Sequence, residues 1–164
     1  MSMRSPHLRF GLVITAVAFV LDQAAKWIVT VPLSLETKPY GQIELLPFFN
    51  LTWAQNYGIS LSMFSDQSPT TRWVLVAVTG IVALAVAVWM TREKAKGDVI
   101  ALALILGGAL GNVIDRLLYG HVIDFLDFHL GGWHFPAFNL ADSAITVGAV
   151  LLIYDELRRV RGTR

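Results

Sequence analysis

Five side chains that could take part in acid–base or hydrogen-bonding chemistry lie close together in an otherwise apolar part of this 164-residue chain. They are Asn112, Asp115, Arg116, His121 and Asp124. The stretch that holds them follows directly after the apolar run ALALILGGAL. Because polar and ionisable groups are costly in apolar surroundings, such a cluster indicates a functional site.

The carboxylates of this region suggest one kind of chemistry. Asp115, Asp124 and, further along the chain, Asp142 could work as a pair, since two carboxylates held close together share a proton. One member then takes a proton from water while the other donates to a carbonyl oxygen, which hydrolyses a peptide bond without a nucleophilic side chain or a metal. The spacing alone does not decide which two aspartates form the pair.

Metal-assisted and serine catalysis are the alternatives. Nitrogen and oxygen ligands suit zinc, but the chain has no HExxH motif and no cysteine. The candidate metal ligands are His121, Asp124, Asp127, His129 and His134. Three serines, Ser60, Ser62 and Ser143, have no Lys or His partner in a recognisable motif. We therefore expect neither a metal nor a cofactor.

Several of these polar residues also have a purely structural explanation. Asp22 and Lys26 have the i, i+4 spacing of an ion pair within one helix. Asp115 and Arg116 are adjacent, so on a helix they point apart and need separate partners, and Arg116 could extend to lipid headgroups.

Two further structural explanations concern helix ends and helix packing. Asn139 and Asp142 could cap the start of a helix. Gly107 and Gly111 form a GxxxG pattern, which is typical of close helix packing.

The composition of the chain indicates which kind of protein positions these residues. The chain is 55% hydrophobic and only 15% charged, whereas soluble domains average about 25% charged residues. This composition excludes a soluble domain and predicts an integral membrane protein. The net charge of +1 gives no reason to expect nucleic acid binding. Asp22 and Lys26 interrupt the first apolar segment, which favours a retained span over a cleavable signal peptide.

The expected fold is an all-α membrane protein with one domain over residues 1–164. Four apolar segments are long enough to cross a bilayer, at 10–31, 73–90, 99–119 and 138–154. Residues 32–71 and 120–137 form the two outer loops. The first of these, between the first two helices, is rich in aromatic and β-forming residues and predicts a small extracytoplasmic sheet, with Trp53 and Phe64 at headgroup depth.

The basic residues predict the orientation. They precede the first span, lie in the connection at 91–98 and follow the fourth span. These residues are Arg4, Arg9, Arg92, Lys94, Lys96, Arg158, Arg159, Arg161 and Arg164. By the positive-inside rule, both termini are cytoplasmic. The polar cluster then lies at the outer edge of the bilayer.

Two other classes of membrane protein explain this pattern less well. A transporter should carry polar groups through the full depth of the membrane, whereas these groups lie on one side. A non-catalytic assembly factor would not need several carboxylates at one level of the bilayer.

Five motifs resemble those of the lipoprotein signal peptidase family, also called signal peptidase II, over nearly the full length. The matching stretches are DQAAK (22–26), NYG (56–58), GGALGNVIDR (107–116), VIDF (122–125) and FNLADSAI (138–145). One departure is Leu61, where the family usually has an aromatic residue. The resemblance implies a bacterial membrane aspartic peptidase.

The resemblance also implies a role for each matching residue. Asp124 and Asp142 become the catalytic aspartates, and Asp115 becomes a supporting residue that positions Arg116. The expected substrate-binding residues are Asn112, Arg116, Asn139, Asn56 and Gly58, and Asp22 and Lys26 are expected to stabilise the helix assembly.

The implied substrate is a prolipoprotein that carries diacylglycerol on its cysteine and is cut just before that cysteine. The enzyme is expected to be a monomer in the bacterial cytoplasmic (inner) membrane, in contact with membrane lipids, with its active site facing the periplasm. The small residues between Gly107 and Gly111 are expected to leave room for the signal helix and the acyl chains.

Overall fold

The structure, a computed structural model, describes residues 5–58 and 68–162 of the chain. Six residues named above lie outside the described residues: Arg4, Ser60, Leu61, Ser62, Phe64 and Arg164.

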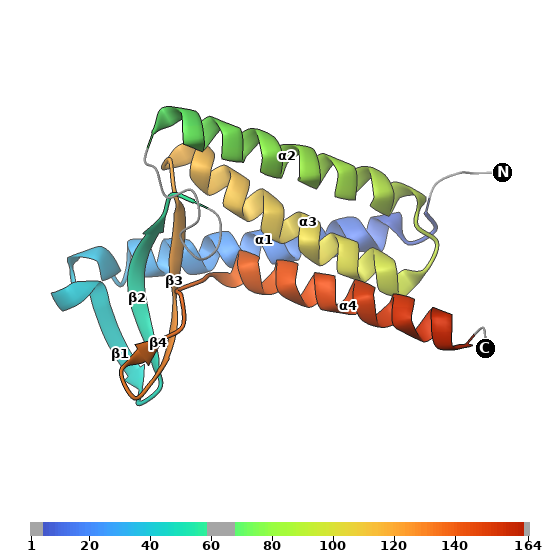
Figure 1. The fold of residues 1–164 in the computed structure, drawn as a ribbon. Coiled ribbons are helices and arrows are strands. Elements are labelled where there is room, and N and C mark those ends of the chain that lie inside the picture. The colour runs from blue at the N-terminus through green and yellow to red at the C-terminus, as the bar shows by residue number, and fades with distance from the viewer. Residues whose placement is uncertain (1–4, 59–67, 163–164) are drawn as a thin grey trace.

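Long helices pack side by side to form the body of the molecule (Figure 1). They are α1 (Leu8–Thr30), α2 (Pro69–Arg92), α3 (Lys96–Leu118) and α4 (Leu140–Gly162). The α3 helix is central, since it packs against each of the other three. The helices match the four predicted segments within a few residues at most of their ends, and the largest difference is that α4 continues beyond residue 154 to Gly162.

Three segments of the described residues are long and apolar enough to cross a membrane: Leu8–Thr37, Pro69–Arg92 and Lys96–Leu118. Helix α4 does not meet the same criterion. It carries Asp142 in its first turn and a charged group of residues near its end, including Asp155 and Glu156. The structure therefore supports three candidate spans, and the fourth stays a prediction.

A small antiparallel sheet lies at one end of the helices, and its strands run across the helix direction (Figure 1). Its strand order is β1 (Gln42–Leu46), β2 (Phe49–Asn56), β3 (Val122–Leu130) and β4 (Trp133–His134). The strands predicted between the first two helices are confirmed as β1 and β2. The segment predicted as the second outer loop, residues 120–137, also contains strands that were not predicted, since β3 and β4 come from it and β3 pairs with β2.

The sheet is joined to the helices by an apolar core. Val29 in the last turn of α1 and Leu35 in the following short 3-10 helix (Leu35–Thr37) pack against Ile123 and Phe125 of β3, and Trp53 is partly buried against the same core. Both termini lie at the opposite end of the molecule from the sheet (Figure 1).

The glycines of α3 allow its close approach to α1 and α4. A Cβ atom added at Gly107 would lie 2.7 Å from the Thr15 carbonyl oxygen of α1, and one added at Gly108 would overlap the Ala141 carbonyl oxygen of α4. The predicted helix-packing role is thus confirmed at Gly107. The expectation that these glycines leave room for substrate was wrong, because neighbouring helices already fill the space.

Candidate active site

Two of the three candidate aspartates meet in one cleft beneath the sheet. Asp124 lies on β3, where it pairs with Ala54 of β2, and Asp142 lies in the first turn of α4. Both line a cleft of about 590 Å³ together with Asn56 and Ser143. The remaining lining residues are Phe135, Pro136, Ala137, Phe138, Thr146 and Val147. The cleft therefore combines a carboxylate pair with a mainly apolar wall that continues along α4.

Asp124 is almost fully buried and receives a hydrogen bond at each carboxylate oxygen. Asn139 Nδ2 donates to Oδ1 at 2.7 Å, and Asn56 Nδ2 donates to Oδ2 at 2.9 Å. Burial, and to a lesser degree the charge of Asp142, raises the pKa of Asp124 to about 7, although both asparagine hydrogen bonds act in the opposite direction. A carboxyl group of this kind exchanges protons near neutral pH, as an acid–base catalyst must.

Asp142 belongs to the cap of α4 and to the carboxylate pair at once. Its backbone N–H donates to Asn139 Oδ1 at 2.9 Å, and the Asn139 N–H donates back to Asp142 Oδ2 at 3.4 Å. This reciprocal arrangement confirms the predicted cap. The other carboxylate oxygen, Oδ1, accepts a hydrogen bond from Asn112 Nδ2 at 2.8 Å. The cap thus fixes where the carboxylate of Asp142 lies in the cleft.

Each of the three asparagines that donate to this carboxylate pair has its own carbonyl oxygen occupied. Asn56 Oδ1 accepts from the Gly58 N–H at 3.0 Å, and Asn112 Oδ1 accepts from Lys26 Nζ at 3.3 Å. Asn139 Oδ1 accepts from Asp142, as described above. Because a side-chain amide has its acceptor and donors on opposite sides, these contacts turn each NH₂ group toward a carboxylate.

Lys26 links the helices behind this cleft. Its Nζ lies 2.7 Å from Asp22 Oδ2 and 2.7 Å from Asp115 Oδ2, and all three side chains are at most 3% exposed. The predicted i, i+4 ion pair of Asp22 and Lys26 is confirmed. Gln23, which no sequence pattern indicated, donates to Asp115 Oδ1 at 2.9 Å.

The side chain of Asp115 bonds to other groups than Arg116, the residue that it was expected to position. Its described hydrogen bonds come from Lys26, Gln23 and the backbone N–H of Ile123, the last at 3.3 Å. No bond from Asp115 to Arg116 is found among the described residues. These bonds connect α1 to the start of β3, which is the strand that carries Asp124.

Arg116 reaches the backbone two residues beyond the end of β2. Its Nη2 donates to the Gly58 carbonyl oxygen at 2.6 Å, and its Nη1 donates to the Asn112 carbonyl oxygen at 3.4 Å. Its Nε has no hydrogen-bond partner among the described residues. Asp115 and Arg116 thus have separate partners, as predicted. The alternative that Arg116 extends to lipid headgroups was wrong, because its side chain is only 7% exposed.

The histidines do not form the metal site considered as an alternative. His134 Nδ1 lies 2.9 Å from Asp127 Oδ1, and its ring stacks on His129 with ring centroids 5.0 Å apart. His121 lies elsewhere, against Tyr57, and burial lowers its pKa. Within residues 5–58 and 68–162, no three His, Asp or Glu side chains are grouped to hold a metal ion.

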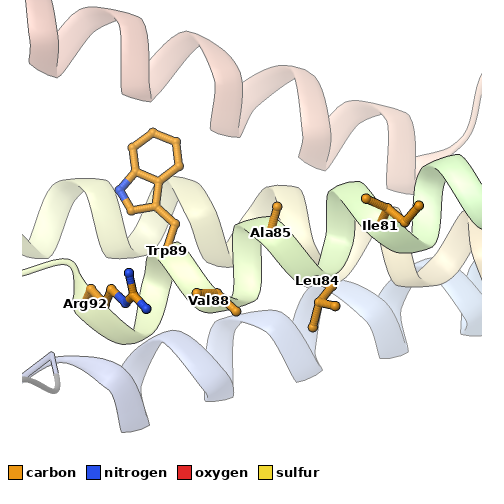
Figure 2. A pocket seen from close by; sticks show the side chains of 6 residues that line it. All are labelled: Ile81, Leu84, Ala85, Val88, Trp89 and Arg92. Atoms are coloured by element: carbon orange, nitrogen blue, oxygen red, sulfur yellow. The ribbon is translucent and has the colours of Figure 1, made fainter.

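A second cavity, of about 510 Å³, lies on one face of α2 (Figure 2). The side chains that line it are Ile81, Leu84, Ala85, Val88, Trp89 and Arg92. None of them is a carboxylic acid, so this cavity is not a candidate for the acid-pair chemistry.

Comparisons with known proteins find relatives that match most of this chain. A sequence profile described as "Signal peptidase (SPase) II" matches residues 14–158. The "Lipoprotein signal peptidase" of Sphingopyxis alaskensis is 69% identical over 93% of this chain and 87% of its own length. That of Burkholderia vietnamiensis is 58% identical over 92% of this chain and 89% of its own length.

Solved structures are similar over the whole fold. One is described as a bacterial membrane enzyme structure by the in meso method at 2.3 Å resolution, and it has a TM-score of 0.83 at 28% identity. It covers 100% of this chain and 97% of its own. The apolar helices and the profile match together define a membrane aspartic peptidase. The chain belongs to the signal peptidase II family.

Proposed function

We propose that this protein removes the signal peptide from bacterial prolipoproteins that carry diacylglycerol on a cysteine, and that it cuts just before that cysteine. The observation that carries this proposal is the pair Asp124 and Asp142 in one cleft of a chain that belongs to the signal peptidase II family. An apolar wall beside the pair is suited to a substrate that is itself held in lipid.

We propose that α4 is the fourth membrane span and that residues 1–164 form one domain. Both termini and the connection between α2 and α3 then lie in the cytoplasm, and the sheet and the cleft lie at the periplasmic side. The excess of basic residues at the end opposite the sheet supports this orientation. The enzyme works as a monomer surrounded by membrane lipids in the bacterial inner membrane.

Asp124 and Asp142 share one proton and hold the attacking water between them. Burial raises the pKa of Asp124 to about 7, so this carboxyl group can hold the shared proton near neutral pH. In the cycle that we propose, its partner Asp142 takes a proton from the water. The water oxygen then bonds to the scissile carbonyl carbon while Asp124 protonates the carbonyl oxygen. When the C–N bond breaks, the proton that Asp142 took from the water passes to the leaving amine, and the proton on the former carbonyl oxygen returns to Asp124. No step requires a metal or a cofactor.

The polar residues around the pair bind and position the substrate backbone. Asn112, Asn139 and Asn56 hold the two carboxylates through amide groups that are already oriented. Arg116 holds the Gly58 carbonyl at the end of β2, beside the cleft.

The residues behind the cleft act as support. Lys26, together with Asp22 and Asp115, orients Asn112 and so acts on Asp142 through one amide. Preorganised donors of this kind need little rearrangement during the reaction.

The substrate class is tested with purified protein in lipid and two forms of one prolipoprotein, with and without diacylglycerol on the cysteine. We expect the lipidated form to be cut, with the new N-terminus at the modified cysteine, and the unmodified form to remain intact. Equal cleavage of both forms, or cleavage at another position, would contradict the proposed specificity.

A further inference from the structure

Arg72 joins the start of α2 to the end of α3. Its Nε donates to the Arg116 carbonyl oxygen at 2.8 Å, and its Nη2 donates to the Leu117 carbonyl oxygen at 2.7 Å. The guanidinium also lies over the ring of Trp73, 5.3 Å from the ring centroid. One side chain therefore binds two successive carbonyl groups of the helix that carries Arg116.

The carbonyl groups of Arg116 and Leu117 lie in the last turn of α3, where carbonyls need hydrogen-bond donors from outside the helix. The last carbonyls of an α-helix have no partner within the helix, and a cation near this end is favoured by the helix dipole. The turn closes with the Gly120 N–H donating to the Arg116 carbonyl at 3.2 Å. Gly120 has a φ of +85°, and a Cβ atom added there would lie 3.6 Å from Arg72 Nη1. Arg72 thus packs against the glycine at which the chain leaves α3.

The last turn of α3, which Arg72 holds, is close in the chain to several residues of the candidate site. It carries Asp115 and Arg116, and it leads within a few residues to β3 and Asp124. The side chain of Arg116 leaves this turn to reach the Gly58 carbonyl at 2.6 Å. A shift of the turn would therefore move Arg116 relative to the cleft.

We propose that Arg72 is a positioning residue for peptide cleavage, which acts by holding the backbone of Arg116 and Leu117 so that the Arg116 guanidinium is directed at the site. This inference rests on the proposed function. The simpler alternative is that Arg72 only strengthens the contact between α2 and α3, in which case its loss lowers stability but has no specific link to Arg116.

A double-mutant cycle separates the two possibilities. We would measure kcat/KM and thermal stability for Arg72→Met, Arg116→Met and the double variant, with Arg92→Met as the matched control. Arg92 is an exposed arginine at the other end of the same helix. Small displacements of positioning groups can lower rates about 100-fold, so we expect a loss of about 10- to 100-fold for Arg72→Met. The double variant should be no worse than Arg116→Met alone, and the control should retain full activity.

Arg72→Lys provides a second variant should Arg72→Met fold poorly. A lysine keeps the charge but lacks the planar fork that binds two carbonyls, so we expect intermediate activity. Losses that add up in the double variant would overturn the inference, as would full activity of Arg72→Met and Arg72→Lys.

Hydrogen exchange provides a readout that does not depend on cleavage. Exchange at the amides of residues 119 and 120 should be faster in Arg72→Met than in the wild type. Unchanged exchange would overturn the inference. If the wild type cut no substrate, the proposed function would fail, while the exchange result would still decide whether Arg72 holds this turn.

Discussion

Replacing Asn56 by leucine tests the hydrogen bonds that hold Asp124. Asn56 Nδ2 donates to Asp124 Oδ2 at 2.9 Å, and this bond stabilises the ionised form of the carboxyl group. Its loss raises the pKa of Asp124 above the value of about 7 that it has in the wild type. Because Asp124 must be protonated to act as the acid, activity is lost as pH rises through this pKa. The variant should therefore stay active to higher pH, even if its maximal rate is lower.

The size of the shift follows from the strength of this bond. A hydrogen bond to a charged group contributes about 1.5–3 kcal/mol. Since one pH unit corresponds to about 1.36 kcal/mol, the midpoint of the alkaline limb should move up by about one to two pH units. In the wild type, activity should fall about tenfold for each pH unit above the midpoint.

The assay is kcat/KM for lipidated prolipoprotein across the neutral and alkaline range, with the protein in lipid. Gln55→Leu is the matched control, because Gln55 is the preceding residue of β2 and its side chain is exposed. We expect the control to keep the midpoint of the wild type. An unchanged midpoint in Asn56→Leu, or one that moves to lower pH, would refute the role given to this bond.

Two further substitutions test the packing behind the site. Gly108→Leu should lower the unfolding temperature, since its side chain would overlap Ala141 of α4 and overpacking costs about 1–3 kcal/mol; Gly80→Leu, at a position with open space, should not. Lys26→Met should destabilise the protein by about 3–5 kcal/mol, because it leaves two buried aspartates without their cation. Lys94→Met, at an exposed position, serves as its control in the same thermal unfolding measurement, and equal effects of the two lysine variants would contradict the buried network.

The sequence predicted the helices well because each contains a long apolar stretch, even though Asp22 and Lys26 interrupt the first one. The sequence also predicted that Asp124 and Asp142 lie at the same depth in the membrane. Only the family resemblance favoured these two over Asp115 as the catalytic pair. The physical reason for the preference is visible in the structure. Asp115 is held by Lys26 behind the cleft, whereas Asp124 and Asp142 line it.

The sheet was the part that the sequence analysis described incompletely. The segment VIDFLDFHL was rich in β-branched and aromatic residues, and the following Gly131 and Gly132 were typical of a hairpin turn. The contacts of Gln23 and Arg72 could not be predicted, because they depend on which helices lie side by side rather than on a local pattern.

The most direct test of the account compares the wild type with Asp124→Asn and Asp142→Asn, in lipid and with a metal chelator present. Asp155→Asn is the matched control, since it makes the same change on α4 about 20 Å along the helix from Asp142. The account predicts that the wild type and Asp155→Asn cut lipidated prolipoprotein while both cleft variants are folded and inactive. Substantial cleavage by either cleft variant, or loss of wild-type activity with the chelator, would contradict catalysis by an aspartate pair.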